Sequence, residues 1–205
     1  MKKQYAFYFD SSKCSGCKTC QIACKDKNNL EVGVLWRRVY EVSEGGWTNN
    51  DGVWSNNIKT YNMSIACNHC ENPICVLGCP TSAMKKNKNG IVTIDKNKCI
   101  GCRYCEWSCP YGAPQYDEVN SIMGKCDLCI DYVEDGRNPS CVDACPMRVL
   151  DFGEFSEMTK KYSGVKEVYP LPNSVITDPA IIINPHRDAI ENENKNAKII
   201  NEEEV

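Results

Sequence analysis

Long apolar runs and a surplus of basic residues are both missing from this chain of 205 residues. No stretch approaches the ~20 apolar residues that a membrane helix needs, so we expect no direct membrane span. The apolar run at residues 5–9 is far too short for a signal peptide, and no small-residue cleavage site follows it, so we expect no export signal either. A formal net charge of −3 offers no basic surface for nucleic acid.

Catalytic signatures are missing as well. The sequence contains neither a paired nucleophile and base nor a glycine loop of the kind that cradles phosphate. We therefore predict that the chain is not an enzyme and has no catalytic centre of its own.

Cysteine, by contrast, is abundant, with sixteen residues in four groups of four. The groups are Cys14, Cys17, Cys20 and Cys24; Cys67, Cys70, Cys75 and Cys79; Cys99, Cys102, Cys105 and Cys109; and Cys126, Cys129, Cys141 and Cys145. The third group reads C-x2-C-x2-C-x3-C-P, the ferredoxin run that binds iron–sulfur clusters. The first group matches it except that Lys25 replaces the proline. In such a run the fourth cysteine ligates the other cluster of a pair.

Disulfides, zinc and haem are the competing explanations for these cysteines. Residues this densely spaced would struggle to find non-neighbour disulfide partners, and the N-terminus argues against secretion. Zinc ribbons pair two C-x2-C knuckles, which differs from a C-x2-C-x2-C triple. Haem attachment needs C-x-x-C-H, but Glu71 follows Cys70. We therefore predict four 4Fe–4S clusters, which would bring the charge from −3 to about −11 and require nearby amide N–H groups and cations.

An internal repeat with an offset of 85 residues relates the first and third groups. It aligns residues 8–17 with residues 93–102 and continues through the remaining cysteines of both groups. Each copy has a glycine inside its cysteine loop, Gly16 or Gly101, where the backbone must pass close to the cluster.

Secondary structure follows from the repeat and from turn signals. Short strands at Ala6–Phe9 and Ile91–Ile94 lead into the cysteine loops, and short helices are expected around Cys20–Asp26 and Cys105–Ser108. The run from Ile130 to Ser140 reads as a loop, because it contains Asp-Gly and Asn-Pro turn signals.

Two further segments lie outside the cysteine groups. Between the first and second groups, Trp36, Trp47, Trp54 and two glycine-containing turn signals predict strands and a hairpin. These tryptophans form either an interface or core packing around a cluster. After Tyr162 there is no cysteine, and prolines punctuate an apolar segment at residues 180–183. We expect an extended arm that lies on a partner, with a disordered tail as the alternative.

The spacing of the groups predicts their arrangement. The segment Cys67–Pro110 is nearly a complete two-cluster ferredoxin, which leaves the first and fourth groups to pair across it. This predicts an α+β fold of two ferredoxin-like two-cluster domains, one inserted in the other. The outer domain takes residues 1–58 and 111–165, the inserted domain 59–110, and an extended C-terminal tail 166–205. Pairing in chain order is the alternative, and it must bridge 42 residues between the first two groups.

The sequence also resembles a known family. The runs CNHCENP at residues 67–73, CIGCRYC at 99–105 and CPYGAPQY at 109–116 are similar to those of the iron–sulfur subunit of membrane-bound dimethyl sulfoxide reductases. The likeness covers nearly the whole chain, including GVW at 52–54 and ACP at 144–146. The cysteine pattern alone indicates a wider group that serves polysulfide, tetrathionate, arsenate and formate enzymes. The tryptophan-bearing insert and the chain length favour the dimethyl sulfoxide branch.

The resemblance implies a nested set of ligands. Four sets of cysteines would each hold one cluster: Cys14, Cys17, Cys20 and Cys145; Cys126, Cys129, Cys141 and Cys24; Cys67, Cys70, Cys75 and Cys109; and Cys99, Cys102, Cys105 and Cys79. Some relatives replace the second cysteine of the third group with tryptophan and hold a 3Fe–4S cluster there. Because Cys102 is present, we expect four cubanes.

The resemblance also implies partners and a function. In this family the subunit lies between a molybdopterin catalytic subunit and an integral membrane anchor that oxidises quinol, so the chain would attach to the membrane through its partners. The first-group cluster would face the molybdenum subunit and the third-group cluster the quinol site. The complex is often exported on the catalytic subunit's twin-arginine signal, so the side of the membrane stays open. A free-standing polyferredoxin that shuttles electrons and a zinc-binding interaction module are the other hypotheses.

Four further residues near the cysteines are weaker candidates. His69 lies inside a cysteine loop, where it would tune a cluster or relay protons, or simply hydrogen-bond within the loop. Lys18 and Arg103 occupy equivalent repeat positions, and Lys125 precedes Cys126. Cations there would raise a cluster's reduction potential, unless they are solvated surface charges.

Overall fold

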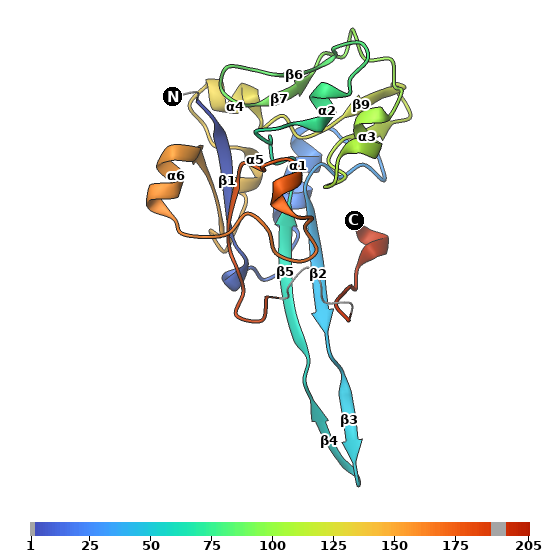
Figure 1. The fold of residues 1–205 in the computed structure, drawn as a ribbon, viewed down its shortest axis with the longest axis vertical. Helices are drawn as coiled ribbons and strands as arrows, with labels where there is room; N and C mark the ends of the chain where they lie inside the picture. The colour runs from blue at the N-terminus through green and yellow to red at the C-terminus, as the bar shows by residue number, and fades with distance from the viewer. Residues whose placement is uncertain (1–2, 190–195) are drawn as a thin grey trace.

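Short strands and short helices make up the part of the chain that the structure describes, residues 3–189 and 196–205. This computed structural model confirms the mixed α+β content expected from the sequence. A broad body carries the cysteines, and one long hairpin projects from it (Figure 1).

A three-stranded sheet forms one side of the body. Its central strand is β1 (Tyr5–Asp10), which pairs antiparallel with β10 (Leu150–Glu154) and parallel with β11 (Ile181–Asn184). Phe9 of β1 is fully buried in the main core. Since β1 runs through the 3-10 turn η1 (Ser11–Lys13) into the first cysteine loop, this sheet fixes the position of the first group.

The C-terminal segment corrects one prediction. We expected residues 166–205 to form an extended arm that lies on a partner, but β11 completes the sheet of β1, and Ile181, Ile182 and Ile183 are buried. Further on, β12 (Lys198–Ile199) pairs with β2. The four consecutive apolar residues at 180–183 are therefore explained by a buried strand of the chain's own sheet. Two 3-10 turns complete the segment, η2 (Ser174–Ile176) and η3 (Glu202–Glu204).

The second sheet continues into the projecting hairpin. Strand β2 (Arg38–Glu44) pairs antiparallel with β5 (Lys59–Ile65) along their whole length, from Arg38 opposite Ile65 to Glu44 opposite Lys59. The predicted domain boundary at residue 58 therefore separates β2 from its pairing partner β5. Beyond these strands, β3 (Trp47–Asn50) and β4 (Val53–Asn56) pair in the same hairpin, and every residue of both strands is exposed.

The turn of this hairpin was readable from the sequence. Asp51 and Gly52 have φ values of 53° and 87°, which are the two left-handed residues of a type I′ turn. The hairpin places Trp47 and Trp54 on one face, because Trp47 lies opposite Asn56 and Trp54 lies opposite Asn49. Packing around a cluster is thus excluded for these two tryptophans, whereas Trp36 packs against the main core.

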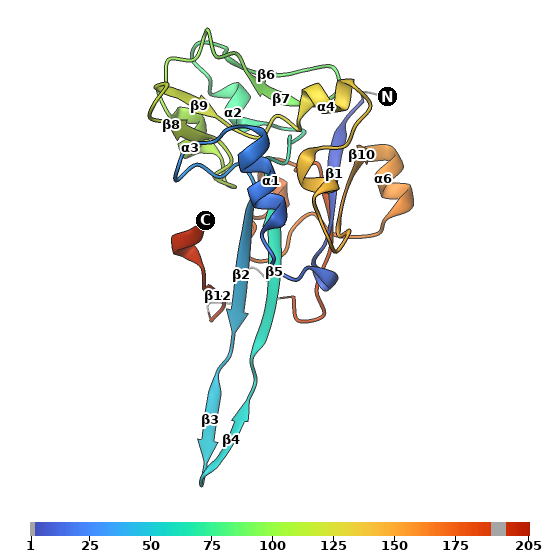
Figure 2. The same cartoon turned by 180° about the vertical axis from the view of Figure 1, so that it is seen from behind.

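A smaller core lies at the end of the body away from the projecting hairpin, where Figure 2 shows β6 to β9 beside α2 and α3. Buried Met84, Val92, Cys105 and Met123 form it. Two short hairpins and two short helices contribute: β6 (Met84–Lys86), β7 (Val92–Ile94), β8 (Gln115–Asp117), β9 (Ile122–Gly124), α2 (Ile74–Leu77) and α3 (Tyr104–Ser108).

The remaining helices flank the cysteine groups. Helix α1 (Thr19–Lys27) packs against α5 (Ser140–Asp143), and the Ser140 hydroxyl donates to the Ala23 carbonyl at 3.1 Å. This contact brings the first and fourth groups together. Helix α4 (Ile130–Glu134) lies where we predicted a loop. A helix of five residues is too short to give a periodic apolar signal, so the turn signals dominated that prediction. The last helix is α6 (Phe155–Lys161).

Candidate metal centres

The four cysteine loops share one backbone feature. In each group the residue before the second cysteine is left-handed: Gly16 has φ 69°, His69 44°, Gly101 64° and Leu128 65°. For His69 and Leu128, which carry a Cβ, this conformation costs roughly 1–2 kcal/mol each. The sequence repeat relates only the first and third groups, but the backbone shows that all four loops turn in the same way. The common turn points successive cysteines of a loop toward the same space.

A second common feature follows the last cysteine. Three residues after it, the backbone is again left-handed at Ser82, Gly112 and Arg148. These are the groups in which a proline follows the last cysteine. The first group has Lys25 at that position, and α1 simply continues to Lys27. The proline therefore marks where the chain must leave its helix beside the fourth thiol.

Two of the loop glycines also lie against other parts of the chain. A Cβ on Gly16 would approach Asn62 Oδ1 to 2.6 Å, and a Cβ on Gly101 would approach the Ser121 carbonyl oxygen to 2.4 Å. The Asn62 amide donates to the Cys14 carbonyl at 3.1 Å, which holds the first loop. Glycine is thus required for conformation and for space at both positions.

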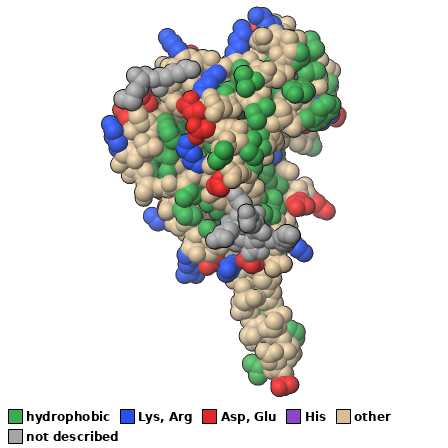
Figure 3. All heavy atoms as spheres, viewed as in Figure 1, with side chains coloured by type: hydrophobic (Ala, Val, Ile, Leu, Met, Phe, Trp, Pro, Cys, Tyr) green, Lys and Arg blue, Asp and Glu red, His purple; other side chains and the backbone are tan. Residues whose placement is uncertain are grey.

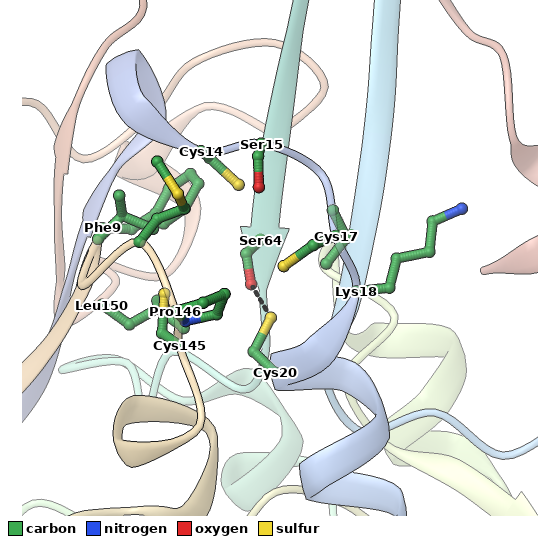
Figure 4. A pocket seen from close by; sticks show the side chains of 13 residues that line it. Phe9, Cys14, Ser15, Cys17, Lys18, Cys20, Ser64, Cys145, Pro146 and Leu150 are labelled. Carbon is green, nitrogen blue, oxygen red and sulfur yellow. Dashed lines mark hydrogen bonds between the residues drawn. The ribbon is translucent and has the colours of Figure 1, made fainter.

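Thiols of the first and fourth cysteine groups meet in one hollow. Figure 4 shows the sulfur atoms of Cys14, Cys17, Cys20 and Cys145 directed into a common space. The Ser64 hydroxyl lies 3.4 Å from Cys20 Sγ. The first cysteine group thus meets the last cysteine of the fourth group, and its own Cys24 does not line this hollow.

A similar hollow lies between the second and third groups. Cys79, Cys99, Cys102 and Cys105 line this second hollow. Backbone N–H groups are directed at two of these sulfurs, because Met84 donates to Cys79 Sγ and Met123 to Cys99 Sγ, each at 3.4 Å. Hydrogen bonds of this kind stabilise the anionic sulfur of a bound cluster.

The other eight cysteines gather in two sets, one partly buried and one buried, whose members act on one another electrostatically. Burial and the nearby Cys67 and Cys109 thiols raise the pKa of Cys70 to about 12. The same neighbours act on Cys75, whose pKa burial also raises to about 12. These four thiols belong to the second group and the end of the third.

The last set combines the fourth group with the end of the first. Burial, followed by the Cys141 and Cys129 thiols, raises the pKa of Cys24 to about 12. The pKa of Cys126 lies well above its ordinary value because the thiol is fully buried, with Cys24, Cys67 and Cys141 beside it. All four members of this set are buried, whereas Cys17 and Cys102 in the two hollows are exposed.

This arrangement suits iron–sulfur clusters better than the alternatives. None of the sixteen cysteines, all of which the structure describes, forms a disulfide. Nor do any three His, Cys, Asp or Glu side chains in residues 3–189 and 196–205 converge tightly enough for a single metal ion. The thiols are spaced around hollows instead. Burial raises the pKa of many of them, so a cationic metal core is required to hold them as thiolates.

Three buried cations lie among the thiols. Arg37, Arg38 and Lys125 have relative exposures of 2%, 8% and 3%. Arg38 Nη2 donates to the Tyr111 carbonyl at 2.6 Å, and Lys125 donates to the carbonyls of Val92 and Cys126. Lys125 was a candidate from the sequence. The two arginines were missed, because nothing near them in the sequence links them to a cysteine.

The other charged candidates from the sequence are at the surface. Lys18 pairs with Glu41 and Glu204, and Figure 4 shows it extending away from the hollow. Arg103 pairs with Glu106 at 2.7 Å. Lys18 and Arg103 start α1 and α3 with φ values of 59° and 62°, so their equivalence in the repeat is one of backbone shape.

His69 is a buried loop histidine. Its Nδ1 accepts from the Val92 N–H at 3.0 Å, while Nε2 has no partner among the described residues. Burial, with Lys125 and Lys86 nearby, lowers its pKa well below the ordinary value. The side chain is therefore neutral, and it ties the second cysteine loop to β7 through the hydrogen bond from Val92.

None of the helices among the described residues has the length and apolar character to cross a bilayer. Figure 3 shows where hydrophobic side chains gather instead, at the end of the body that carries α2 and α3 and at the hairpin tip. The exposed residues at the first place are Leu77, Ile100, Tyr104 and Trp107.

The sequence model of a family described as "4Fe-4S dicluster domain" matches residues 58–155. Together with the cysteine-lined hollows, this match defines the class: the chain is a ferredoxin-type protein that binds 4Fe–4S clusters.

Relatives define the family more closely. The protein is 49% identical over 189 residues to the B subunit of anaerobic dimethyl sulfoxide reductase from Escherichia coli, with 92% of each sequence covered. It is 50% identical over 188 residues to the B subunit of the same reductase from Haemophilus influenzae, covering 91% of this protein and 92% of the relative. The thiosulfate reductase electron transfer subunit of Salmonella typhi is 34% identical over 175 residues, covering 82% and 86%. The protein belongs to the family of iron–sulfur subunits of anaerobic dimethyl sulfoxide reductases.

Proposed function

We propose that this chain carries four 4Fe–4S clusters and relays electrons from a quinol-oxidising membrane anchor to a molybdopterin catalytic subunit that reduces dimethyl sulfoxide or a similar S- or N-oxide. The chain itself contributes no catalytic group. The clusters supply one-electron redox chemistry, and the protein's part is to hold them in order, shield the inner ones from water and present the outer ones to partners.

The observation that carries this proposal is a row of four cysteine sets with exposed thiols only in its end sets. Cys17 belongs to one end set and Cys102 to the other. The Cys141 thiol acts electrostatically on Cys20, and the Cys67 thiol acts on Cys126, so the first three sets of the row are each within electrostatic reach of the next. A row of this kind suits transfer through the protein from one surface to another.

The ligand sets of the proposal follow the nested arrangement. Each cluster would take three cysteines from one group and its fourth from the partner group: Cys14, Cys17, Cys20 and Cys145; Cys24, Cys126, Cys129 and Cys141; Cys67, Cys70, Cys75 and Cys109; and Cys79, Cys99, Cys102 and Cys105. The two hollows and the two other sets support it, since each brings these side chains together.

Exposed apolar side chains support the assignment of partners. Around Cys102, the side chains of Leu77, Tyr104 and Trp107 are 82%, 50% and 76% exposed. Apolar surface this concentrated favours a contact with another protein, and an integral membrane anchor is the partner that the family resemblance implies for this end. The hairpin, with Trp47 and Trp54 about 60% exposed on one face, projects away from it and would bind the catalytic subunit.

The relatives favour dimethyl sulfoxide as the acceptor. The two dimethyl sulfoxide reductase relatives are about half identical to this chain, against 34% for the thiosulfate reductase relative. Equivalent subunits of polysulfide, tetrathionate, arsenate or formate enzymes remain the second candidate because they share the cysteine pattern. The extensive exposed apolar surface argues against a free-standing polyferredoxin.

Isolation of the native complex through a tag on this chain tests the proposal. We expect a molybdopterin subunit and a membrane anchor to co-isolate, with sixteen irons and sixteen sulfides in this chain. Quinol should drive dimethyl sulfoxide reduction by the complex, and the purified chain should show no turnover. About eight irons after full anaerobic reconstitution, or a chain that purifies alone with all its iron, would contradict it.

A further inference from the structure

Among the described residues, Arg37 is the most enclosed charge, and it has no acidic partner there. Its guanidinium lies over the Phe7 ring, with Cζ 4.5 Å from the ring centroid, and the residue is 2% exposed. Nη1 donates to the Ser64 hydroxyl at 3.1 Å, and that hydroxyl lies 3.4 Å from Cys20 Sγ. Arg37 is thus linked through Ser64 to a thiol of the Cys14 hollow.

Two of the three guanidinium nitrogens are without an acceptor. Nε and Nη2 are buried, and neither has a hydrogen-bond partner among the described residues. Buried donors are nearly always paired in folded proteins, so unpaired ones indicate an acceptor that the polypeptide does not supply. Cluster sulfides and cysteine thiolates are acceptors of this kind.

The thiols that act on Arg37 come from two different sets. Cys20 belongs to the set with Cys14, Cys17 and Cys145, whereas Cys24, Cys126 and Cys141 belong to the inner set with Cys129. Despite complete burial, these thiols together keep the pKa of Arg37 above its ordinary value. The guanidinium is therefore linked through Ser64 to the Cys14 set and lies within electrostatic reach of thiols of both sets.

We infer that Arg37 is a positioning residue shared by two clusters, those of the Cys14 and Cys126 sets, and that its charge and free N–H groups stabilise the reduced form of both. This inference rests on the proposed four-cluster function. When either cluster accepts one electron from its donor, its net charge becomes more negative by one. A fixed positive charge within electrostatic reach of both favours that change in each.

The other cations are less suited to this role. Lys18 and Arg103 are matched by surface glutamates, and exposed charges are screened. Lys125 donates to the carbonyls of Val92 and Cys126, so acceptors within the chain already hold its ammonium group. A unit charge acting over about 12 Å at an effective dielectric constant of about 20 changes a one-electron equilibrium about tenfold. Arg37 should have an effect of this size on two clusters together.

Redox titration of the full chain with its clusters, followed by electron spin resonance, tests the inference. In Arg37→Gln we expect the equilibrium constant for one-electron reduction of the Cys14 cluster, and that of the Cys126 cluster, to fall about tenfold each. This corresponds to a reduction potential lower by about 59 mV for a one-electron couple. The other two clusters should be unchanged. Arg37→Lys should lie closer to the native protein, because it keeps the charge but loses the planar fork. The matched control is Arg187→Gln, which removes an arginine whose side chain is 87% exposed.

Each outcome decides the inference. Unchanged potentials in Arg37→Gln with full iron content overturn it, as does a shift in only one cluster or an equal shift in all four. If Arg37→Gln loses iron, the inference requires that the Cys14 and Cys126 signals are the ones lost and that Arg37→Lys restores both; any other pattern overturns it. Chemical mediators supply the electrons, so the result is independent of whether the chain serves a molybdopterin enzyme. Fewer than sixteen irons in the native chain would instead count against the proposed function.

Discussion

Replacement of Gly101 by alanine should selectively weaken the cluster of the Cys99 set. The left-handed φ of 64° costs an alanine roughly 1–2 kcal/mol. The new Cβ would also lie 2.4 Å from the Ser121 carbonyl oxygen and 3.1 Å from the Tyr116 ring. Such overpacking destabilises the folded protein by about another 1–3 kcal/mol, because the backbone must move to make room for the new methyl group. Since Gly101 precedes Cys102 directly, the movement displaces a ligand.

Gly136 provides the matched control for this substitution. It has a similar φ of 75°, and a Cβ there would meet nothing within 4 Å. Gly136→Ala therefore has the conformational cost without the clash, and because guanidinium releases clusters as the whole chain unfolds, the difference in unfolding rate between the variants isolates the clash. Under anaerobic guanidinium, the Cys99 cluster should be lost about 5 to 150 times faster in Gly101→Ala than in Gly136→Ala, as 1–3 kcal/mol requires. Equal rates would show that the close approach to Ser121 places no constraint on the loop.

Two other predictions concern the ends of the row. Cys102→Ser should convert its cubane to a 3Fe–4S form with a higher potential and slow quinol-driven reduction; an unchanged oxidised-state spin-resonance spectrum would show that Cys102 is no ligand. Trp107→Ser should reduce recovery of the membrane anchor with the tagged chain, and the double replacement of Trp47 and Trp54 by serine should reduce recovery of the catalytic subunit. Both variants should keep their full iron content. Undiminished recovery of both partners would show that these tryptophans lie outside the interfaces.

Local structure near the cysteines was readable from the sequence because spacing and glycine determine it. The predicted strands became β1 and β7, and the predicted helices became α1 and α3, with ends that differ by at most one residue. The left-handed loops at Gly16 and Gly101 follow from the same pattern. Equivalent loops at His69 and Leu128 could not be read in this way, since neither residue type signals a positive φ.

Long-range contacts were harder to predict. The apolar run at residues 180–183 indicated burial, but nothing in it identified β1 as its partner, so we expected an arm on another protein. Arg37 gives the sharpest case. Arginine is usually exposed, and its role depends on Cys20, Cys126 and Cys141, which only the fold brings near it.

The nested arrangement makes a prediction that no other pairing shares. Cys145 belongs to the fourth group in sequence, but its side chain lies in the hollow of Cys14, Cys17 and Cys20 and is 5% exposed. Cys24 lies instead among the thiols of the fourth group. If these neighbours are ligands, Cys145→Ser should damage the cluster of the first group and leave the cluster of the fourth group its full set of four thiols.

Three variants titrated side by side decide this point. Cys145→Ser should perturb the same spin-resonance signal as Cys17→Ser and a different signal from Cys129→Ser, although Cys129 is much closer to it in sequence. The reason is that serine is a poor ligand for the iron that loses its thiolate, so the affected cluster changes its form or potential. If Cys145→Ser and Cys129→Ser alter one signal together while the Cys17→Ser signal stays native, each group keeps its own four ligands. The exchange of fourth cysteines, and with it the row from Cys17 to Cys102, would then have to be abandoned.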